Sequence, residues 1–211
     1  VRGVAGEGAL SVLDRVTDNN RYRFDQLCRR RAIEGAANLN MQTHLSINFM
    51  PNAVYRPELC IRSTLEAAKK HNFPIERLIF ETLESEHVDN YRHLTHILRE
   101  YREFGFKTAI DDFGAGFSNF TRLEHLQPSL IKVDRSLVRR AGSEQEGGVA
   151  FLTAATSVAA SLNCDVVAEG VQTQAEAQVV KLLGVRYVQG FRYAEPGPIE
   201  VYLDASAEPW T

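Results

Sequence analysis

Six short apolar runs in this sequence each end in polar side chains that could do chemistry. These side chains belong to Asn48, Glu81, Asp111 with Asp112, Lys132 with Asp134, Glu169 and Gln189. A strand of a parallel sheet is covered on both faces and normally reads as apolar throughout, so a polar residue at every end is unusual. We therefore interpret the six ends as parts of one functional site.

The chemistry of this set points to divalent cations. Its ligands are oxygen atoms, with no Cys or His among them, and this favours Mg²⁺ or Mn²⁺ over zinc. Four crowded carboxylates would raise one another's pKa unless a cation compensated them. The adjacent Asp111 and Asp112 can serve two ions, and two ions roughly 3.5–4 Å apart form a clamp for in-line phosphoryl chemistry. With Lys132 to orient a water or neutralise a phosphate oxygen, the set predicts a metal-dependent phosphodiester hydrolase.

The elements that must position these residues alternate along the chain. The predicted strands span residues 45–49, 78–81, 108–111, 130–134, 166–169 and 187–191. The predicted helices span residues 23–39, 57–71, 88–104, 117–126, 148–162 and 174–183. Gly105 and Gly184 stand where a helix end needs a left-handed residue. Such an alternation predicts an α/β fold with a parallel sheet.

The strand-end residues favour a closed barrel over an open doubly wound sheet. In a parallel barrel the carboxyl ends of all strands meet on one face, where such folds place their active sites. A full barrel takes about 250 residues, and this chain has 211. We therefore expect a (β/α)8 TIM-like barrel that lacks its first strand or strands. We predict one domain over residues 1–204, incomplete at its N-terminus, and a flexible tail over residues 205–211.

Composition excludes several classes of protein. The net charge of −3 excludes a nucleic-acid binder driven by bulk positive charge, so we expect no DNA or RNA polymer as partner. The longest uncharged run, residues 147–164, is too polar for a bilayer, and no secretory leader opens the chain. The three cysteines are widely spaced and form no CxxC pair, which indicates a reducing compartment. We expect a cytoplasmic domain with no membrane contact.

Several motifs resemble those of a known family. The run DDFGAGFS at residues 111–118 is similar to the DDFGTGYSS loop of EAL domains, the bacterial phosphodiesterases of cyclic di-GMP. Further similar motifs follow the family's order: SIN at 46–48, ETLES at 81–85, KVDRS at 132–136, AEGVQT at 168–173 and QGF at 189–191. So many ordered matches over most of the chain make chance agreement implausible.

The resemblance implies a fold, a reaction and a metal site. The fold would be a (β/α)8 barrel, and the reaction the hydrolysis of cyclic di-GMP to linear pGpG with two Mg²⁺ or Mn²⁺ ions as cofactors. The first ion would be bound by Asn48, Glu81 and Asp111. The second would be bound by Asp111, Asp112 and Glu169.

The resemblance also implies roles for other residues. The catalytic residues would be Lys132, Glu81 and Asp111, with Lys132 assisting the attacking water. The substrate would contact Arg2, Asp134 and Gln189. Glu84 would anchor the loop over residues 112–118.

Three departures from the family pattern favour an alternative. The signature glutamate would lie immediately before Val1 and is not in this chain. Gln172 replaces a family glutamate near the second ion, which removes a negative charge. Glu195 stands where the family often has a basic residue, and at the rim of the site it would repel a dianionic ligand. The alternative is a degenerate EAL domain that binds cyclic di-GMP or a protein partner without catalysis.

The remaining expectations concern partners and surface residues. Residues 48–55 resemble the EAL subgroup fused to blue-light flavin sensors, so we expect a sensor domain in the same parent chain. The family's dimers predict a homodimer through the helices beside the DDFG loop. His93 and His96 are interpreted as part of a solvated helix face, and the run 29–31 of three arginines as the charged outer face of a helix.

Overall fold

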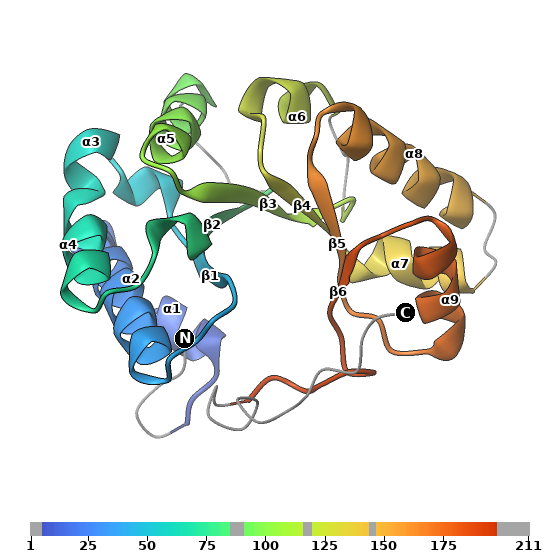
Figure 1. Cartoon of the computed structure of the whole chain (residues 1–211), viewed down its shortest axis with the longest axis horizontal. Coiled ribbons are helices and arrows are strands. Elements are labelled where there is room, and N and C mark those ends of the chain that lie inside the picture. Colours follow the sequence, from blue (N-terminus) through green and yellow to red (C-terminus); the bar gives the residue numbers. More distant parts are fainter. Residues whose placement is uncertain (1–5, 85–90, 116–119, 144–146, 198–211) are drawn as a thin grey trace. The chain divides into compact units, whose positions relative to one another are not determined.

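The computed structural model describes residues 6–84, 91–115, 120–143 and 147–197. Within these ranges the chain has an α/β fold, and its strands form a six-stranded sheet in the order β1-β2-β3-β4-β5-β6 (Figure 1). The chain divides into two compact units, residues 1–80 with 88–106 and residues 81–87 with 107–211. The predicted alternation of strands and helices is therefore confirmed, and the predicted tail over residues 205–211 lies outside the described residues.

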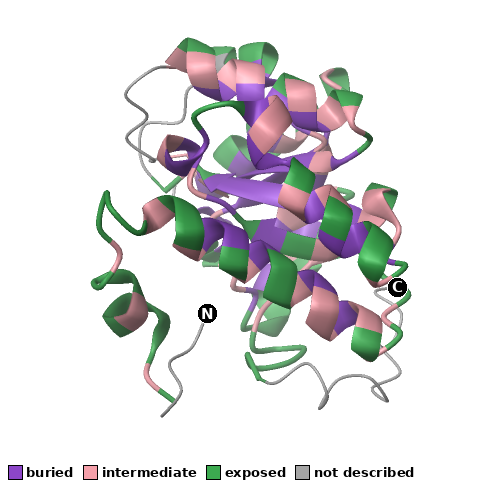
Figure 2. Ribbon diagram, turned by 90° about the vertical axis from the view of Figure 1, so that its left-hand side faces the viewer, coloured by how far each residue is buried: buried purple, intermediate pink, exposed green. Residues whose placement is uncertain are grey.

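The first unit consists mainly of helices. Its elements are α1 (Ala9–Leu13), α2 (Arg21–Asn38), β1 (Leu45–Asn48), η1 (Pro51–Ala53), α3 (Pro57–Cys60), α4 (Arg62–Lys70), η2 (Ile75–Arg77), the start of β2 (Leu78–Leu83) and α5 (Tyr91–Glu103). Figure 2 shows that the longer helices have one buried and one exposed face, whereas α1 has no buried residue. The helix predicted over residues 57–71 divides at Ile61, and α1 was not predicted.

The second unit holds a run of strands that pair in parallel. Its elements are the end of β2, β3 (Lys107–Phe113), α6 (Phe120–Leu126), β4 (Leu130–Val133), α7 (Arg135–Gly142), α8 (Gly148–Ser161), β5 (Asp165–Ala168), α9 (Gln174–Leu182) and β6 (Tyr187–Val188). Strand β4 is buried along its whole length and pairs in parallel with β3 and β5, so that Ile131 lies opposite Ile110 and Val166. The left-handed glycines predicted at 105 and 184 have φ of 94° and 72°.

Helix α7 was not predicted, although the sequence carries its signals. The carboxylate of Asp134 caps the helix by accepting a hydrogen bond from the amide of Ser136. At the other end, Gly142 packs directly on the first turn of α9. A Cβ atom at this glycine would lie 2.6 Å from Cγ and 2.9 Å from Cα of Glu176, so no other residue type fits without a shift of backbone.

The core of the first unit is built around aromatic rings. The ring of Phe80 lies 4.9 Å from that of Tyr101, 5.3 Å from that of Phe106 and 6.0 Å from that of Phe49. All four side chains are almost fully buried. Such pairs contribute beyond the area they bury, so this cluster holds the start of β2 against α5 and against the residue that follows β1.

The arginine run at residues 29–31 corrects one expectation. Arg30 and Arg31 are exposed, but Arg29 is fully buried among the aromatic rings. Consecutive residues on a helix point in different directions, so one arginine of the three turns inward.

The two histidines of α5 differ in their surroundings. His96 lies beside Arg99 and Glu100 on a charged face, as predicted, whereas the half-buried His93 forms a hydrogen bond with the carbonyl of Val54. No described helix is both long enough and apolar enough to cross a membrane.

The aromatic cluster yields a stability prediction. Phe80→Ala removes the ring that contacts three others, and we expect it to lower the free energy of unfolding by about 3–5 kcal/mol. Leu182→Ala is the control, because Leu182 is 85% exposed and its loss should change stability by less than about 0.5 kcal/mol. Urea unfolding followed by circular dichroism measures both. Equal midpoints for the two variants would show that the cluster does not hold the unit together.

Candidate active site

The ends of neighbouring strands bring the predicted polar residues of the second unit together. Glu81 lies in β2, Asp111 in β3 and Lys132 in β4, while Glu169 follows β5. Because β3, β4 and β5 pair in parallel, their carboxyl ends lie at the same edge of the sheet. The register of the strands therefore places these side chains around one point.

That point is the ammonium group of Lys132. Its Nζ lies 2.8 Å from Oε1 of Glu169, 2.9 Å from Oδ1 of Asp111 and 3.2 Å from Oε2 of Glu81. The exposed fractions of the four side chains are small, between 7% and 13%. Three buried carboxylates would repel one another strongly without a positive charge between them, so Lys132 makes their close approach tenable.

A further carboxylate completes a group suited to a divalent cation. Asp111, Asp112 and Glu169 each offer an oxygen atom, and these three atoms all lie within 4.8 Å of one another. Asp112 reaches this position because its backbone is left-handed, with φ of 55°, and its amide donates to Oδ1 of Asp111. Carboxylate oxygens are the ligands that Mg²⁺ and Mn²⁺ prefer, so the residues present fit such an ion.

Burial and crowding shift the protonation of these groups. Burial raises the pKa of Glu169 to about 7; Lys132 opposes the rise and Asp111 adds to it. Burial also raises the pKa of Asp112, and the neighbouring Asp111 and Asp134 act in the same direction. The pKa of Lys132 is raised by Glu81, Glu169 and Asp111, which outweigh the opposing effect of burial. The site thus carries more negative charge than the protein alone can compensate.

Glu84 holds the chain that follows β3. Its Oε2 accepts a hydrogen bond of 3.1 Å from the amide of Gly114, and its own amide donates to the carbonyl of Asp111 at 2.9 Å. Gly114 has φ of 98°, and a Cβ atom there would lie 3.1 Å from Leu137. These contacts link the end of β2 to the DDFG segment at residues 111–114. The rest of the predicted loop, residues 116–118, lies outside the described residues.

A cavity opens beside the carboxylates. It measures about 400 Å³ and is lined by Asp112, Ala115, Asp134, Arg135, Glu169, Gly170 and Gln189. The amide of Gln189 donates to Oε1 of Glu169. Asp134 therefore both caps α7 and faces the cavity. Arg135 was not predicted as a site residue, although its place beside Asp134 in the KVDRS motif was a usable signal.

The remaining predicted residues that the structure describes are not among those that line this cavity. Asn48 ends β1 in the first unit, where its side chain is exposed, and Arg2 lies outside the described residues. Gln172 and Glu195, two of the three departures from the family pattern, are both exposed. Among the described residues that line the cavity, neither of the two occurs.

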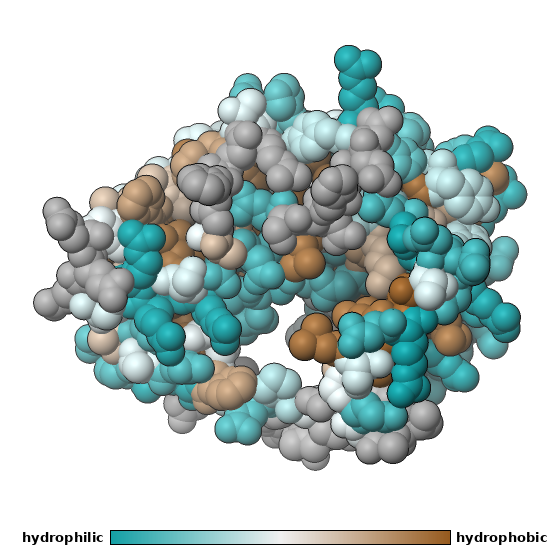
Figure 3. Space-filling view, turned by 180° about the vertical axis from the view of Figure 1, so that it is seen from behind, coloured by the Kyte–Doolittle hydropathy of each residue, from teal (hydrophilic) through white to brown (hydrophobic). Residues whose placement is uncertain are grey.

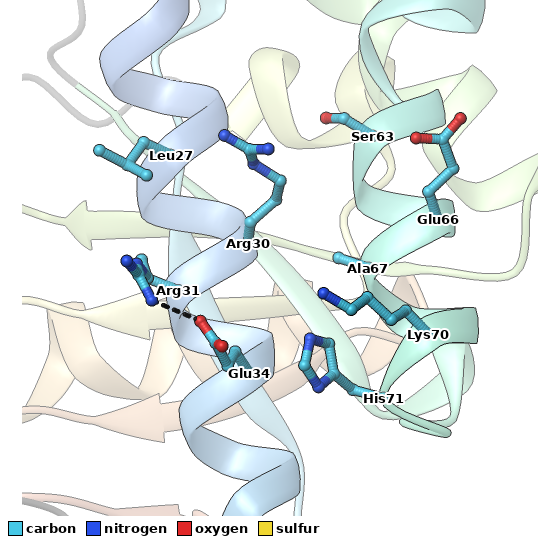
Figure 4. Close-up of a pocket in the computed structure, with 9 residues that line it drawn as sticks. All are labelled: Leu27, Arg30, Arg31, Glu34, Ser63, Glu66, Ala67, Lys70 and His71. Carbon is cyan, nitrogen blue, oxygen red and sulfur yellow. Dashed lines mark hydrogen bonds and ion pairs between the residues drawn. The ribbon is translucent and has the colours of Figure 1, made fainter.

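A second cavity, in the first unit, has a different character. It lies between α2 and α4 and has a volume of about 380 Å³. Figure 4 shows that side chains of both signs of charge line it. Arg31 pairs with Glu34 at 2.7 Å, and Arg30, Glu66 and Lys70 complete its charged lining. Such a mixture is typical of solvated helix surfaces. Figure 3 shows a face of the molecule that is likewise largely hydrophilic, with small hydrophobic areas.

Comparison with known proteins identifies similar sequences and structures. The model of the EAL domain matches residues 16–196. The probable cyclic di-GMP phosphodiesterase PdeD of Escherichia coli K12 is 33% identical over 181 residues, which cover 85% of this chain and 32% of PdeD. The cyclic di-GMP phosphodiesterase PdeF of the same organism is 29% identical over 73% of this chain and 20% of its own length. The chain therefore spans about a third or less of these relatives.

Two solved structures share the fold. A standalone EAL protein from Vibrio cholerae O395, in its c-di-GMP-bound form, is 44% identical with a TM-score of 0.87, over 93% of this chain and 82% of its own. BlrP1 from Klebsiella pneumoniae, in a complex with manganese and cyclic di-GMP, is 28% identical with a TM-score of 0.83. That match covers 92% of this chain and 50% of BlrP1.

The raised pKa of Glu169 yields a pH-dependent prediction. Because this pKa is about 7 in the folded chain, against roughly 4.3 in an unfolded one, the folded state binds the proton more tightly. The contribution of this carboxyl to stability is complete below about pH 4.3 and is lost as the pH rises through about 7. Glu169→Gln abolishes the titration. The free energy of unfolding of the variant, minus that of the native chain, should therefore rise by roughly 1–3 kcal/mol between pH 5 and pH 8.

Urea unfolding in the presence of a chelator, at several pH values across this window, measures the difference. The control is Glu103→Gln, which removes a carboxylate with a side chain that is 64% exposed and should give a difference that does not change with pH. A difference for Glu169→Gln that is equally flat would contradict the prediction.

Proposed function

The chain belongs to the EAL family, and from this premise we propose that it hydrolyses one phosphodiester bond of cyclic di-GMP to give linear pGpG. The observation that carries the proposal is the gathering of Asp111, Asp112 and Glu169, with oxygen atoms within 4.8 Å of one another, beside a cavity of about 400 Å³. Relatives named as cyclic di-GMP phosphodiesterases and EAL structures that contain cyclic di-GMP support the same substrate.

The proposed cofactors are two Mg²⁺ or Mn²⁺ ions. We propose that Asn48, Glu81 and Asp111 hold the first ion and that Asp111, Asp112 and Glu169 hold the second. Such ions lower the pKa of bound water and neutralise charge on a phosphate. The structure of BlrP1 with manganese and cyclic di-GMP supports this choice of ion.

In the proposed reaction the residues of this chain orient the attacking water and stabilise negative charge on the phosphate. A water oxygen bonds to phosphorus, the bond from phosphorus to the 3′ oxygen breaks, and the water's proton is lost as the 3′ oxygen gains one. Lys132 keeps a positive charge next to three carboxylates, so it suits a role in orienting the water and in stabilising negative charge on the phosphate. Glu84 would fix the DDFG segment, and Asp134 and Gln189 would contact the substrate from the cavity wall.

Two of the three departures from the family pattern give little support to a domain without catalysis, because of where they lie. Gln172 and Glu195 are exposed, and neither lines the cavity. The backbone amide of Gln172 donates to Glu176 at 2.7 Å, a contact that any residue except proline can make. These observations favour turnover over binding without catalysis.

Cyclic di-GMP turnover by the full-length protein in excess Mn²⁺ tests the proposal. We expect Asp111→Asn and Glu81→Gln each to lower kcat/KM by at least about 100-fold, because each removes a ligand oxygen from an ion. The matched control is Glu66→Gln, which changes a carboxylate in the cavity between α2 and α4 and should leave kcat/KM within about 2-fold. Chromatography follows the formation of pGpG.

Equilibrium binding of cyclic di-GMP, measured in parallel, separates the alternatives. Native protein that forms pGpG, with loss in the two site variants, supports the hydrolase. Binding without any pGpG would replace the proposal with a receptor for cyclic di-GMP. If the protein neither binds cyclic di-GMP nor forms pGpG, the proposal would be replaced by a protein-interaction domain.

A further inference from the structure

Helix α2 contains a buried ion pair that the proposed mechanism does not use. Asp25 and Arg29 are 3% and 0% exposed, and NH2 of Arg29 lies 2.8 Å from Oδ2 of Asp25. The guanidinium stands 4.9 Å from the ring centre of Phe80 and 5.6 Å from that of Tyr101, whose hydroxyl accepts a hydrogen bond from it at 2.8 Å. A buried pair seldom stabilises a fold more than apolar residues of similar volume would, so its presence needs another explanation.

The other oxygen of Asp25 bonds the chain that follows β1. Oδ1 accepts a hydrogen bond of 3.0 Å from the backbone amide of Met50. The residue between Met50 and the end of β1 is Phe49, whose ring centre lies 5.5 Å from the guanidinium of Arg29. The pair therefore fixes both residues that directly follow Asn48, one through its amide and the other through its ring.

Asn48 depends on such anchoring more than the other proposed ligands do. Its side chain is exposed, so packing does not set its orientation. It is neutral and offers a single carbonyl oxygen, whereas a carboxylate offers two oxygens and a charge that draws the ion from several directions. Its backbone is therefore the main determinant of where that oxygen points.

We propose that Asp25 is a positioning residue for the metal site: its carboxylate fixes the backbone after Asn48 and so holds the Asn48 amide in the orientation that binds a divalent cation. Arg29 supplies the counter-charge that makes a carboxylate tolerable at this buried place. The inference rests on the proposed function, because the role of Asn48 as a ligand is part of that proposal.

Four variants of the full-length protein separate positioning from mere stability. Asp25→Asn keeps an oxygen that can accept from Met50 but leaves Arg29 without its counter-charge. The double variant Asp25→Leu with Arg29→Met removes the acceptor and the buried charge together, so it should be more stable than Asp25→Asn. Tyr101→Phe removes a hydrogen bond of Arg29 without touching Met50, and Asn48→Ala removes the proposed ligand itself.

The readouts are the affinity for Mn²⁺, from the electron paramagnetic resonance signal of the free ion, and the urea midpoint without metal. Asp25→Asn and Tyr101→Phe should lose stability but keep the native Mn²⁺ affinity within about 2-fold. The double variant should bind Mn²⁺ about 10-fold or more weakly despite its higher stability, as outer-shell changes do at other metal sites. Asn48→Ala should bind it at least as weakly. If Asp25 had a purely structural role, the Mn²⁺ affinity of each Asp25 variant would instead fall in proportion to its loss of stability.

The contrary outcomes are distinct. If Asn48→Ala weakens Mn²⁺ binding and the double variant does not, the positioning role is overturned and the proposed function stands. If Asn48→Ala binds Mn²⁺ like the native protein, Asn48 is not a ligand and the inference falls with that assignment. Loss of Mn²⁺ binding in Asp111→Asn would then still support the rest of the proposed site.

Discussion

The mutual repulsion of buried carboxylates is the constraint on which this site depends. Glu81, Asp111 and Glu169 converge because the strands that carry them are neighbours, and each is too buried for water to screen its charge. Lys132 lies at the centre of the three and offsets part of that charge. Asp112 and Asp134 add further negative charge at the rim. The excess that remains makes this edge of the sheet attractive to small, highly charged cations.

The rest of the second unit holds this arrangement in place with backbone contacts. Glu84 bonds the amide of Gly114, the left-handed conformation of Asp112 directs its side chain, and Asp134 caps α7. After β5, Gly170 has φ of 63° and lies so close to Arg135 that a Cβ atom would come within 2.4 Å of that residue's own Cβ. The segments that carry these carboxylates are thus shaped by turns and caps, which a change of surface side chains leaves intact.

Much of this could be predicted from the sequence, for physical reasons. Each strand is a short apolar run with a polar end, and that pattern located all six strands as well as the residues around Lys132. Helix α7 was missed because it starts directly after a strand, although Asp134 is a good cap and Leu137, Val138 and Ala141 form its buried face. The inward turn of Arg29 could not be predicted, since its acceptors, Asp25 and Tyr101, are ordinary in the sequence and meet only in the fold. The contact of Asp25 with Met50 joins residues 25 positions apart, and no local pattern indicates it.

The absence of a side chain at Gly142 has a mechanical consequence. Helix α7 is capped by Asp134, which lines the cavity, and ends at Gly142, which rests on the backbone of Glu176. Glu176 in turn bonds the amides of Gln172 and Thr173, a few residues after Glu169. The segment after β4 and the segment after β5 are therefore packed against each other through a contact that leaves no room for a side chain. A displacement of α9 would be carried to both walls of the cavity at once, so that the two strands' contributions to the site shift as a single rigid piece.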